Sequence, residues 1–355
     1  MKKIIIAAAI LGAFAATAQA QSNVAIYGIL DAGIVHESGG TNGNLTKVGS
    51  GISSASRFGF RGTEDLGNGL SALFTLEGGV KIDTGIGGAG IFDRQSFVGL
   101  KSTTLGTVTI GRQYTLLYLA LGQVADPFGV GYSGSARGLF PSVGNATRTS
   151  NTVMYASPKM SGFSADLAYS AGEQAGSNVA GRQIGADVAY SNGPLNARLV
   201  YNAINNDTAA VSNDIGRNTM FAANYDFVVA KAFFAYSDNK GMNSSALPNA
   251  IAYTTPTTPV AASTDSTNLL IGATVPVGPA GTVMASYIRK NDKNVANRDA
   301  DQFAIGYSYA LSKRTNAYTS FAKIKNKNGA SYTVGDNTDA GSGDKAFSVG
   351  VRHSF

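Results

Sequence analysis

Apolar and polar residues alternate along most of the chain, in short segments that are separated by Gly, Asn, Asp and Pro. A period of two is typical of β-strands with one apolar and one polar face, and the separating residues are those that favour turns. Strands of roughly 8–12 residues are long enough to cross a bilayer at a tilt. The pattern predicts sixteen strands, at about 23–36, 52–63, 70–81, 92–101, 107–113, 150–157, 163–172, 182–191, 195–205, 217–225, 228–238, 267–275, 282–290, 301–310, 315–325 and 345–355.

The connections between these strands alternate between short and long. Short ones such as 64–69 and 192–194 follow the even-numbered strands, whereas the longest, at about 114–149, 239–266 and 326–344, follow odd-numbered ones. Transmembrane barrels have this asymmetry, and an even number of strands brings both chain ends to the same mouth. A soluble β-propeller would instead repeat with a period of about 40 residues, and no such repeat is present. We therefore predict an all-β fold, a 16-stranded antiparallel transmembrane β-barrel.

The beginning of the chain has the pattern of a secretory signal peptide. Lys2 and Lys3 precede an apolar run, and a small-x-small cleavage site follows at 18–20. We expect residues 1–20 to be removed and residues 21–355 to form one barrel domain. Loss of the two lysines lowers the formal net charge from +6 to +4. No later stretch approaches the roughly 20 consecutive apolar residues of a membrane helix.

The last segment, Lys345–Phe355, alternates strictly and ends on an aromatic residue. One face carries Phe347, Val349, Val351, His353 and Phe355. An amphipathic strand that ends on Phe resembles the terminal signal of outer-membrane β-barrels, which the barrel assembly machinery reads. This resemblance implies a location in the outer membrane and identifies Phe355 as the assembly signal.

Composition removes several classes of function. Cys is absent, so the chain has neither disulfides nor a thiolate metal site. The formal net charge is +6, but Lys and Arg are scattered singly, which argues against nucleic acid as a partner. The glycines at 85–90 match a dinucleotide fingerprint, yet a predicted strand follows them where that fingerprint requires a helix. We expect no cofactor and no metal.

The parity of the clearest strands indicates which charged side chains face the interior. Phe58 and Phe60 define the outward face of their strand, so Arg57 and Arg61 face inward. A charge on the lipid face at mid-membrane costs about 2–4 kcal/mol, which makes the inward assignment the cheaper one. Glu77 faces inward for the same reason, opposite Phe74 and Leu76 on its strand.

Two more arginines follow from the same rule. With Phe97 facing outward, Arg94 and Ser96 face inward, and with Val153 and Tyr155 facing outward, Arg148 faces inward. The parity is imperfect because Val98 shares a face with Arg94, and Arg112 falls on the side of Ile110 and Val108. We leave Arg112 out of the candidate set for that reason.

The connection 114–149 is too long and too apolar for a simple surface loop. Its leucines and phenylalanines would not stay in water, so we expect it to fold into the barrel and narrow the pore. Asp126 is its only acid, while Arg137 and Arg148 lie in or beside it. A ring of arginines lowers the barrier for anions, so the constriction is expected to prefer them. The expected constriction consists of Arg57, Arg61, Arg94, Arg148, Asp126 and Glu77. The alternative that these arginines are solvated wall residues with little net effect stays open.

The segment Ser56–Glu77, with the sequence SRFGFRGTEDLGNGLSALFTLE, resembles the second hairpin of the general porins of β-proteobacteria. The same pattern is matched, in colinear order over the whole mature chain, by Val24–Asp31, Asp93–Leu100, Gly111–Gln113, Asn151–Pro158 and Val351–Phe355. The resemblance implies a homotrimeric outer-membrane porin that passes ions and small hydrophilic solutes by passive diffusion. Its implied partners are outer-membrane lipid and lipopolysaccharide, the assembly machinery that binds the C-terminal strand, and small anions.

The family pattern also implies that Arg57, Arg94 and Arg148 form a constriction cluster, often with anion selectivity. Here the loop lacks the acidic cluster that many relatives carry beyond the Asp-Pro-Phe-Gly sequence at 126–129, and this departure favours anions. Three alternatives remain. One is a channel specific for phosphate or small organic anions, and another is a closed adhesin or scaffold barrel. An outer-membrane enzyme is the third, although His36 and His353 are the only histidines.

Overall fold

The computed structural model describes residues 23–40, 43–141, 146–208, 211–245, 265–334 and 343–355. The predicted signal peptide and parts of the predicted long loops lie outside the described residues. The strands are β1 Asn23–Gly40, β2 Gly43–Ser50, β3 Arg57–Gly67, β4 Leu70–Lys81, β5 Ile86–Gly87, β6 Gln95–Ser102, β7 Gly106–Tyr114, β8 Arg148–Ala156, β9 Phe163–Ser170, β10 Gln183–Asn192, β11 Leu195–Ile204, β12 Gly216–Asp226, β13 Lys231–Lys240, β14 Ser266–Val277, β15 Gly281–Asp292, β16 Ala300–Ala310, β17 Thr315–Asn326 and β18 Lys345–Ser354.

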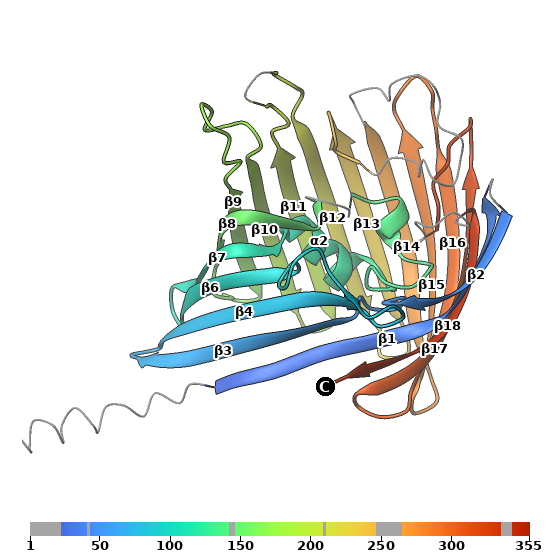
Figure 1. Cartoon of the computed structure of the whole chain (residues 1–355), viewed down its shortest axis with the longest axis horizontal. Helices are drawn as coiled ribbons and strands as arrows, with labels where there is room; N and C mark the ends of the chain where they lie inside the picture. The colour runs from blue at the N-terminus through green and yellow to red at the C-terminus, as the bar shows by residue number, and fades with distance from the viewer. Residues whose placement is uncertain (1–22, 41–42, 142–145, 209–210, 246–264, 335–342) are drawn as a thin grey trace, which may run out of the picture.

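Sixteen of these strands form the wall of a closed antiparallel barrel (Figure 1). The other two are short additions, since β2 pairs with one end of β1 and β5 pairs with two residues of β4. The barrel closes at β1, which pairs with β3 along one part of its length and with β18 on its other edge. The predicted 16-stranded antiparallel barrel is confirmed.

The structure differs from the sequence prediction in the first hairpin. β1 continues to Gly40 and turns back as β2, although the sequence placed this region in a loop. Gly39 and Gly43, at φ of +82° and +88°, allow the chain to reverse there. The next wall strand begins at Arg57 and not at residue 52, because residues 51–56 bend across the barrel interior.

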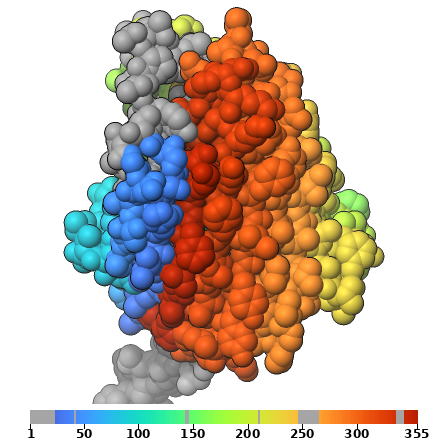
Figure 2. All heavy atoms as spheres, turned by 90° about the vertical axis from the view of Figure 1, so that its right-hand side faces the viewer, coloured from blue at the N-terminus to red at the C-terminus, as the bar shows by residue number. Residues whose placement is uncertain are grey.

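Large apolar side chains cover the outside of the wall, as the alternation predicts. Phe58, Val153 and Leu167 are 39%, 45% and 57% exposed, whereas Thr152 and Asp187, on the opposite face, are buried. Figure 2 shows one part of this outer surface, where the last strands in orange and red lie beside β1 and β2 in blue. Apolar side chains that cover the outside of a barrel match the lipid that surrounds an outer-membrane protein.

The long connection between β7 and β8 folds into the barrel, where Figure 1 places helix α2. We call it the inner loop; it contains α2 (Leu116–Ala120), the π-helical turn η1 (Leu121–Ala125) and the 3₁₀ turn η2 (Ala136–Gly138). Its apolar residues are buried and form most of the hydrophobic core with residues of the facing wall. None of the helices in the described residues is long and apolar enough to span a membrane. The predicted inward-folded loop is confirmed.

Polar side chains of the opposite wall hold the inner loop in place. Asn224 of β12 donates to the carbonyl of Val124 at 2.9 Å. Gln302 of β16 donates to the carbonyls of Gly134 and Ser135 at 2.9 and 3.0 Å. Buried loop carbonyls therefore have partners, as burial requires. The helical turns of the loop lie against β10–β13, and a cavity remains at β3, β7 and β8.

Candidate pore constriction

A cavity of about 320 Å³ lies between the inner loop and the wall on this side. Five arginines line it, Arg57, Arg94, Arg112, Arg137 and Arg148, together with Gly51–Ala55, Tyr118, Gly129–Gly131 and Thr147. Within the described part of the chain, no acidic side chain lines this cavity. This cavity is therefore bordered by positive charge.

Arg94 is fixed from two sides. Its Nε donates to Glu77 Oε1 at 2.8 Å, and its Nη2 donates to the Tyr114 hydroxyl at 2.6 Å. Glu77 also accepts from the Tyr27 hydroxyl at 3.1 Å and lies 3.8 Å from Arg57 Nε. Glu77 is only 4% exposed, so it lies behind the arginines and orients them without lining the cavity itself.

Arg148 is held by a stack of two tyrosines. Its guanidinium carbon lies 4.3 Å from the Tyr114 ring centroid, and its Nη2 donates to the Tyr114 hydroxyl at 2.8 Å. Tyr114 stacks on Tyr118 of α2 with 5.1 Å between ring centroids. Burial raises the pKa of the Tyr118 hydroxyl, so this ring stays neutral beside the arginines. The stack gives Arg148 a defined position at the base of the inner loop.

Arg112 was excluded by sequence parity, and the structure places it on the cavity. The pairing of β7 with β8 shifts in register between Gly111 and Gln113, and the extra residue lies in β8. β7 keeps its alternation, since Ile110 points outward at 55% exposure while Gln113 is buried and accepts from the Thr109 hydroxyl at 2.7 Å. Arg112 Nε donates to the Asp93 carbonyl at 2.6 Å. Its Nη1 donates to the Ser150 hydroxyl at 3.0 Å, so hydrogen bonds at the end of β7, and not a change of parity, hold this guanidinium at the cavity.

Arg137 also lines the cavity, from η2 of the inner loop. The sequence identified it as part of an electropositive loop but gave no means to orient it. Strand parity does not apply in a loop, so only the folded position of η2 brings this side chain to the cavity.

Arg61 and Asp126 do not line the cavity. Arg61 lies four residues beyond Arg57 on β3, roughly 13 Å along the strand, with its guanidinium 5.1 Å from the Tyr27 ring centroid. Asp126 lies inside the inner loop, where its carboxylate accepts from the backbone N–H groups of Phe128, Val130 and Ala136 at 2.9–3.0 Å. Burial raises the pKa of Asp126 to about 6 although these bonds act in the opposite direction.

The orientation of Phe97 also differs from the sequence expectation. It pairs with Thr75, which shares a face with Glu77, so Phe97 lies on the inner face of β6. Val98 takes the outward position at 59% exposure. Arg94 precedes β6 and lies outside its alternation, which is why it still reaches the cavity.

Phe355 completes the seam where the barrel closes. Its backbone N–H donates to Gly28 of β1 at 3.1 Å, and its carbonyl accepts from Gly28 at 3.2 Å. The ring covers Gly28, where a Cβ atom would overlap it. Position 28 therefore requires glycine for the terminal aromatic ring to lie flat on the seam.

The two histidines lie apart. His36 contacts the Thr46 hydroxyl at 2.8 Å, and His353 contacts the Thr315 hydroxyl at 2.9 Å. His353 pairs with Leu30 on β1, so the two histidines are six positions, roughly 20 Å, apart along that strand. The described residues contain no group of three His, Cys, Asp or Glu that could hold a metal. The glycines at 85–90 form β5 and a turn that leads to β6, not to a helix.

Comparison with known proteins agrees with this architecture. A family model described as Gram-negative porin matches residues 7–329. The chain is 33% identical to an outer membrane porin protein of Bordetella pertussis over the full length of both. An anion-selective porin from Comamonas acidovorans matches with a TM-score of 0.78 and 29% identity, covering 94% of this chain and all of that one.

A Vibrio cholerae outer membrane protein, OmpT in its trimer form, has the same fold at a TM-score of 0.66 and 16% identity, covering 94% of this chain and 99% of that one. The family match covers most of the residues, and the full-length relatives are outer membrane porins. The chain belongs to the Gram-negative porin family, and it is a protein of the outer membrane.

Proposed function

We propose that the chain forms a water-filled channel that prefers anions and that the five cavity arginines set this preference. The observation that carries the proposal is the separation of charges at the cavity, where guanidinium groups line the wall while Glu77 lies behind them. A positive constriction lowers the barrier for anions and raises it for cations. The Comamonas porin with a similar fold is described as anion-selective, which supports the proposal.

Ion substitution in single-channel recordings tests this proposal. Replacing chloride by a bulky organic anion should reduce the current much more than replacing potassium by a bulky organic cation. Equal reductions would indicate that the arginines do not select ions, and a larger effect of the cation would reverse the assignment. A folded protein that carries no current would favour a closed adhesin or scaffold barrel.

A channel specific for phosphate or small organic anions is the second candidate. It is favoured by the fixed positions of three guanidinium groups, because Arg94, Arg112 and Arg148 are each held by hydrogen bonds. Preorganised guanidinium groups suit the oxygen atoms of phosphates and carboxylates. This candidate is supported if added phosphate reduces the chloride conductance and the reduction saturates with phosphate concentration. It is excluded if the conductance in phosphate solutions increases linearly with phosphate concentration.

We further propose a homotrimer that contacts outer-membrane lipid and lipopolysaccharide and is assembled through its C-terminal strand. The support for assembly through this strand is Phe355, whose backbone closes the seam with Gly28. Deleting Phe355 should lower the yield of folded, heat-modifiable barrel in the outer membrane. An unchanged yield would remove Phe355 as an assembly signal, and mass measurement of the purified complex tests the trimer.

Removal of residues 1–20 also belongs to this proposal. The basic start and the small-x-small sequence at 18–20 support cleavage before Gln21. N-terminal sequencing of protein from the outer membrane should begin at Gln21. Protein that still begins at Met1 would contradict it.

A further inference from the structure

A second segment enters the lumen besides the inner loop. Residues 51–56, which we call the inner strap, leave the wall between β2 and β3 and bend across the interior. The arginine-lined cavity and another cavity of about 490 Å³ both border the strap, and they share Gly51, Ile52 and Ala55. The inner strap therefore lies at the boundary between two compartments of the lumen.

Asp31 of β1 binds most of the inner strap. Its carboxylate is fully buried and accepts three backbone N–H groups of the strap at 2.8–3.2 Å, those of Ile52, Ser53 and Ser54. The Asp31 backbone carbonyl accepts from the Gly51 N–H at 2.7 Å, and the Asp31 N–H donates to the Ser56 hydroxyl at 3.0 Å. A buried carboxylate is costly unless hydrogen bonds compensate it, so Asp31 and the strap stabilise each other.

Tyr318 of β17 completes this cluster and connects it to the inner loop. Its hydroxyl donates to Asp31 at 2.6 Å. Its ring lies edge-on to the ring of Tyr132 in the inner loop, with 5.2 Å between the ring centroids. The Tyr132 backbone N–H donates to the Ile52 carbonyl at 2.5 Å. The inner strap thus contacts both the wall and the inner loop.

Ile52 is the apolar anchor of the inner strap. It is only 2% exposed, and its side chain lies against Gly33 and Gly49, which pair across β1 and β2. A Cβ atom at Gly33 would approach the Ile52 side chain to 3.0 Å. Glycine in a strand often marks a place where another segment comes close to the backbone. Here the two glycines leave room on the inner wall for Ile52.

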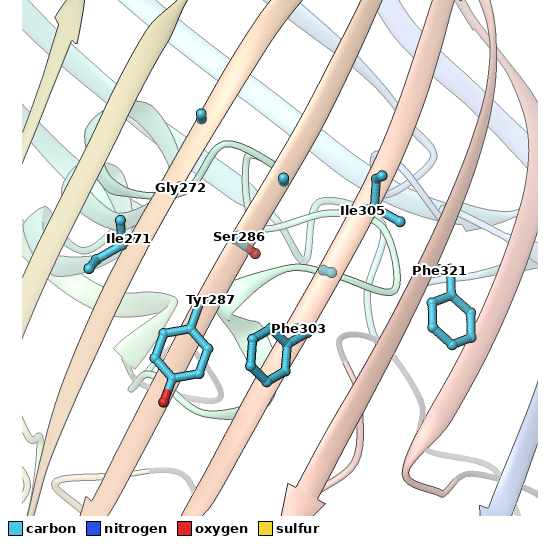
Figure 3. Close-up of a pocket in the computed structure, with 10 residues that line it drawn as sticks. Ile271, Gly272, Ser286, Tyr287, Phe303, Ile305 and Phe321 are labelled. Atoms are coloured by element: carbon cyan, nitrogen blue, oxygen red, sulfur yellow. The ribbon is translucent and has the colours of Figure 1, made fainter.

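The inner loop contacts glycines of the wall in the same way. A Cβ atom at Gly272 would overlap Pro127, and one at Gly306 would overlap Phe128. Figure 3 shows this part of the wall at an outer groove of about 520 Å³, where Ile271, beside Gly272, projects outward. Large side chains therefore cover the lipid face, while glycines occupy the interior positions where a second segment packs. The inner strap has the same kind of contact with the wall as the inner loop has.

We propose that the inner strap is a second constriction element of the channel and that Asp31 is its positioning residue. Held by Asp31, the strap occupies the lumen beside Arg94 and Arg137, which line both cavities. Release of the strap would join the two compartments and widen the path of a solute. The inference rests on the open channel proposed above but not on its ion preference, because it concerns the width of the lumen.

The variant Asp31→Asn tests this role. Both carboxylate oxygens accept hydrogen bonds, so the amide NH₂ of asparagine has to face donors of the cluster and should release the strap. Conductance in 1 M KCl reports width, because the screening length there is only about 3 Å and the lost charge has little effect. We expect the single-channel conductance to rise about 1.5-fold, since pore diameter limits conduction. The largest polyethylene glycol that enters the channel, and thereby lowers its conductance, should also increase in size.

The matched control is Glu37→Gln, which removes another fully buried carboxylate of β1, one that forms an ion pair with Lys47 at 2.8 Å. The control should have the conductance and the polymer limit of the wild type. Folded Asp31→Asn channels with wild-type conductance and polymer limit would overturn the inference. An equal increase in the control would overturn it as well.

Tyr318→Phe tests the same cluster without a change of charge. It removes one donor to Asp31 and keeps the ring contact with Tyr132, so the conductance should rise by less than in Asp31→Asn. The two effects should not add in the double variant, because both substitutions act on one contact.

The same recordings separate a positioning role from a purely structural one. A purely structural Asp31 would lower the yield of folded barrel and leave the conductance of each folded channel unchanged. If Asp31→Asn yields no folded barrel, Tyr318→Phe decides, and an unchanged conductance of that variant overturns the inference. Absence of current from the folded wild type would instead contradict the channel itself, and with it this inference.

Discussion

Arg94 and Arg148 donate to one acceptor, the Tyr114 hydroxyl, at 2.6 and 2.8 Å. The two like charges are thereby held close together at the cavity, and of the two only Arg94 contacts Glu77, which lies behind it. Charged groups that are fixed in this way act on a passing ion without having to reorganise first. The proposed positive constriction thus requires the shared hydroxyl to hold these two arginines in place.

Tyr114→Phe should weaken the anion preference without closing the channel. Loss of the shared acceptor frees both guanidinium groups to move and to be solvated separately, while the ring still stacks on Tyr118. We expect the anion-to-cation permeability ratio to fall about twofold, since a hydrogen bond to a charged group is worth ~1.5–3 kcal/mol when buried and less in a solvated pore. Reversal potentials measure this ratio, and a ratio equal to that of the wild type would dismiss the role of the hydroxyl.

Glu77→Gln should change selectivity and stability in opposite directions. Removing the carboxylate raises the net positive charge at the constriction, so anion preference should rise at low salt. Arg94 is only 7% exposed, and removing one partner of a buried ion pair costs about 3–5 kcal/mol. Urea unfolding in detergent should show reduced stability of the barrel.

The matched control for that experiment is Glu64→Gln, an exposed carboxylate on β3 near the short turn after it. It removes the same charge from the same strand pair and should affect neither quantity. A variant at Glu77 that behaves like this control would show that Glu77 does not support the arginines.

Arg112→Gln should reduce anion preference more than Arg61→Gln. Both substitutions remove one positive charge from the interior wall, but only Arg112 lines the cavity. The difference should shrink in concentrated salt, because the screening length falls from about 10 Å at 0.1 M to about 3 Å at 1 M. Reversal potentials at the two concentrations provide the comparison. A larger effect of Arg61→Gln would show that selectivity depends on the arginines that strand parity places inside, and not on those that line the cavity.

Asp126 makes the stability of the inner loop depend on pH. Its pKa is raised from 3.8 to about 6 in the folded protein, so the folded state holds a proton that the unfolded chain releases. Stability from this group is therefore present below pH 4 and lost as pH rises through 6. Two pKa units correspond to on the order of 3 kcal/mol. The difference in unfolding free energy between wild type and Asp126→Asn should fall by this order between pH 4 and 7.

Urea unfolding at several pH values measures that difference. The comparison with the variant cancels the titration of other groups, which both proteins share. A difference that stays constant across this range, or rises with pH, would show that the Asp126 pKa is not raised.

Regular strands made most of the fold predictable from the sequence. Phe58 and Val153 face outward as the period of two predicts, and the inner loop is internal because its apolar residues must leave water. Arg112 escaped the same rule although β7 keeps its parity, because hydrogen bonds to the Asp93 carbonyl and the Ser150 hydroxyl hold its side chain at the cavity. Parity also gave the wrong face for Phe97. The predicted strand included Arg94, but β6 begins at Gln95, so the face of Arg94 says nothing about the face of Phe97.

Loop geometry limited the prediction of the site. Asp126 and Arg137 belong to one irregular segment. There the sequence shows which side chains are charged but does not predict where they point. Backbone N–H groups from three residues of the loop turn Asp126 inward, and the position of η2 brings Arg137 to the cavity. Such tertiary hydrogen bonds have no periodic signal in the sequence.

The zero-current potential of the wild-type channel in a KCl gradient tests the central claim most directly. The arginine-lined cavity predicts a potential of the sign that chloride permeation produces, decreasing as both salt concentrations are raised and the charges are screened. A potential of the opposite sign, or one that does not depend on ionic strength, would contradict the claim that these arginines select the permeating ion.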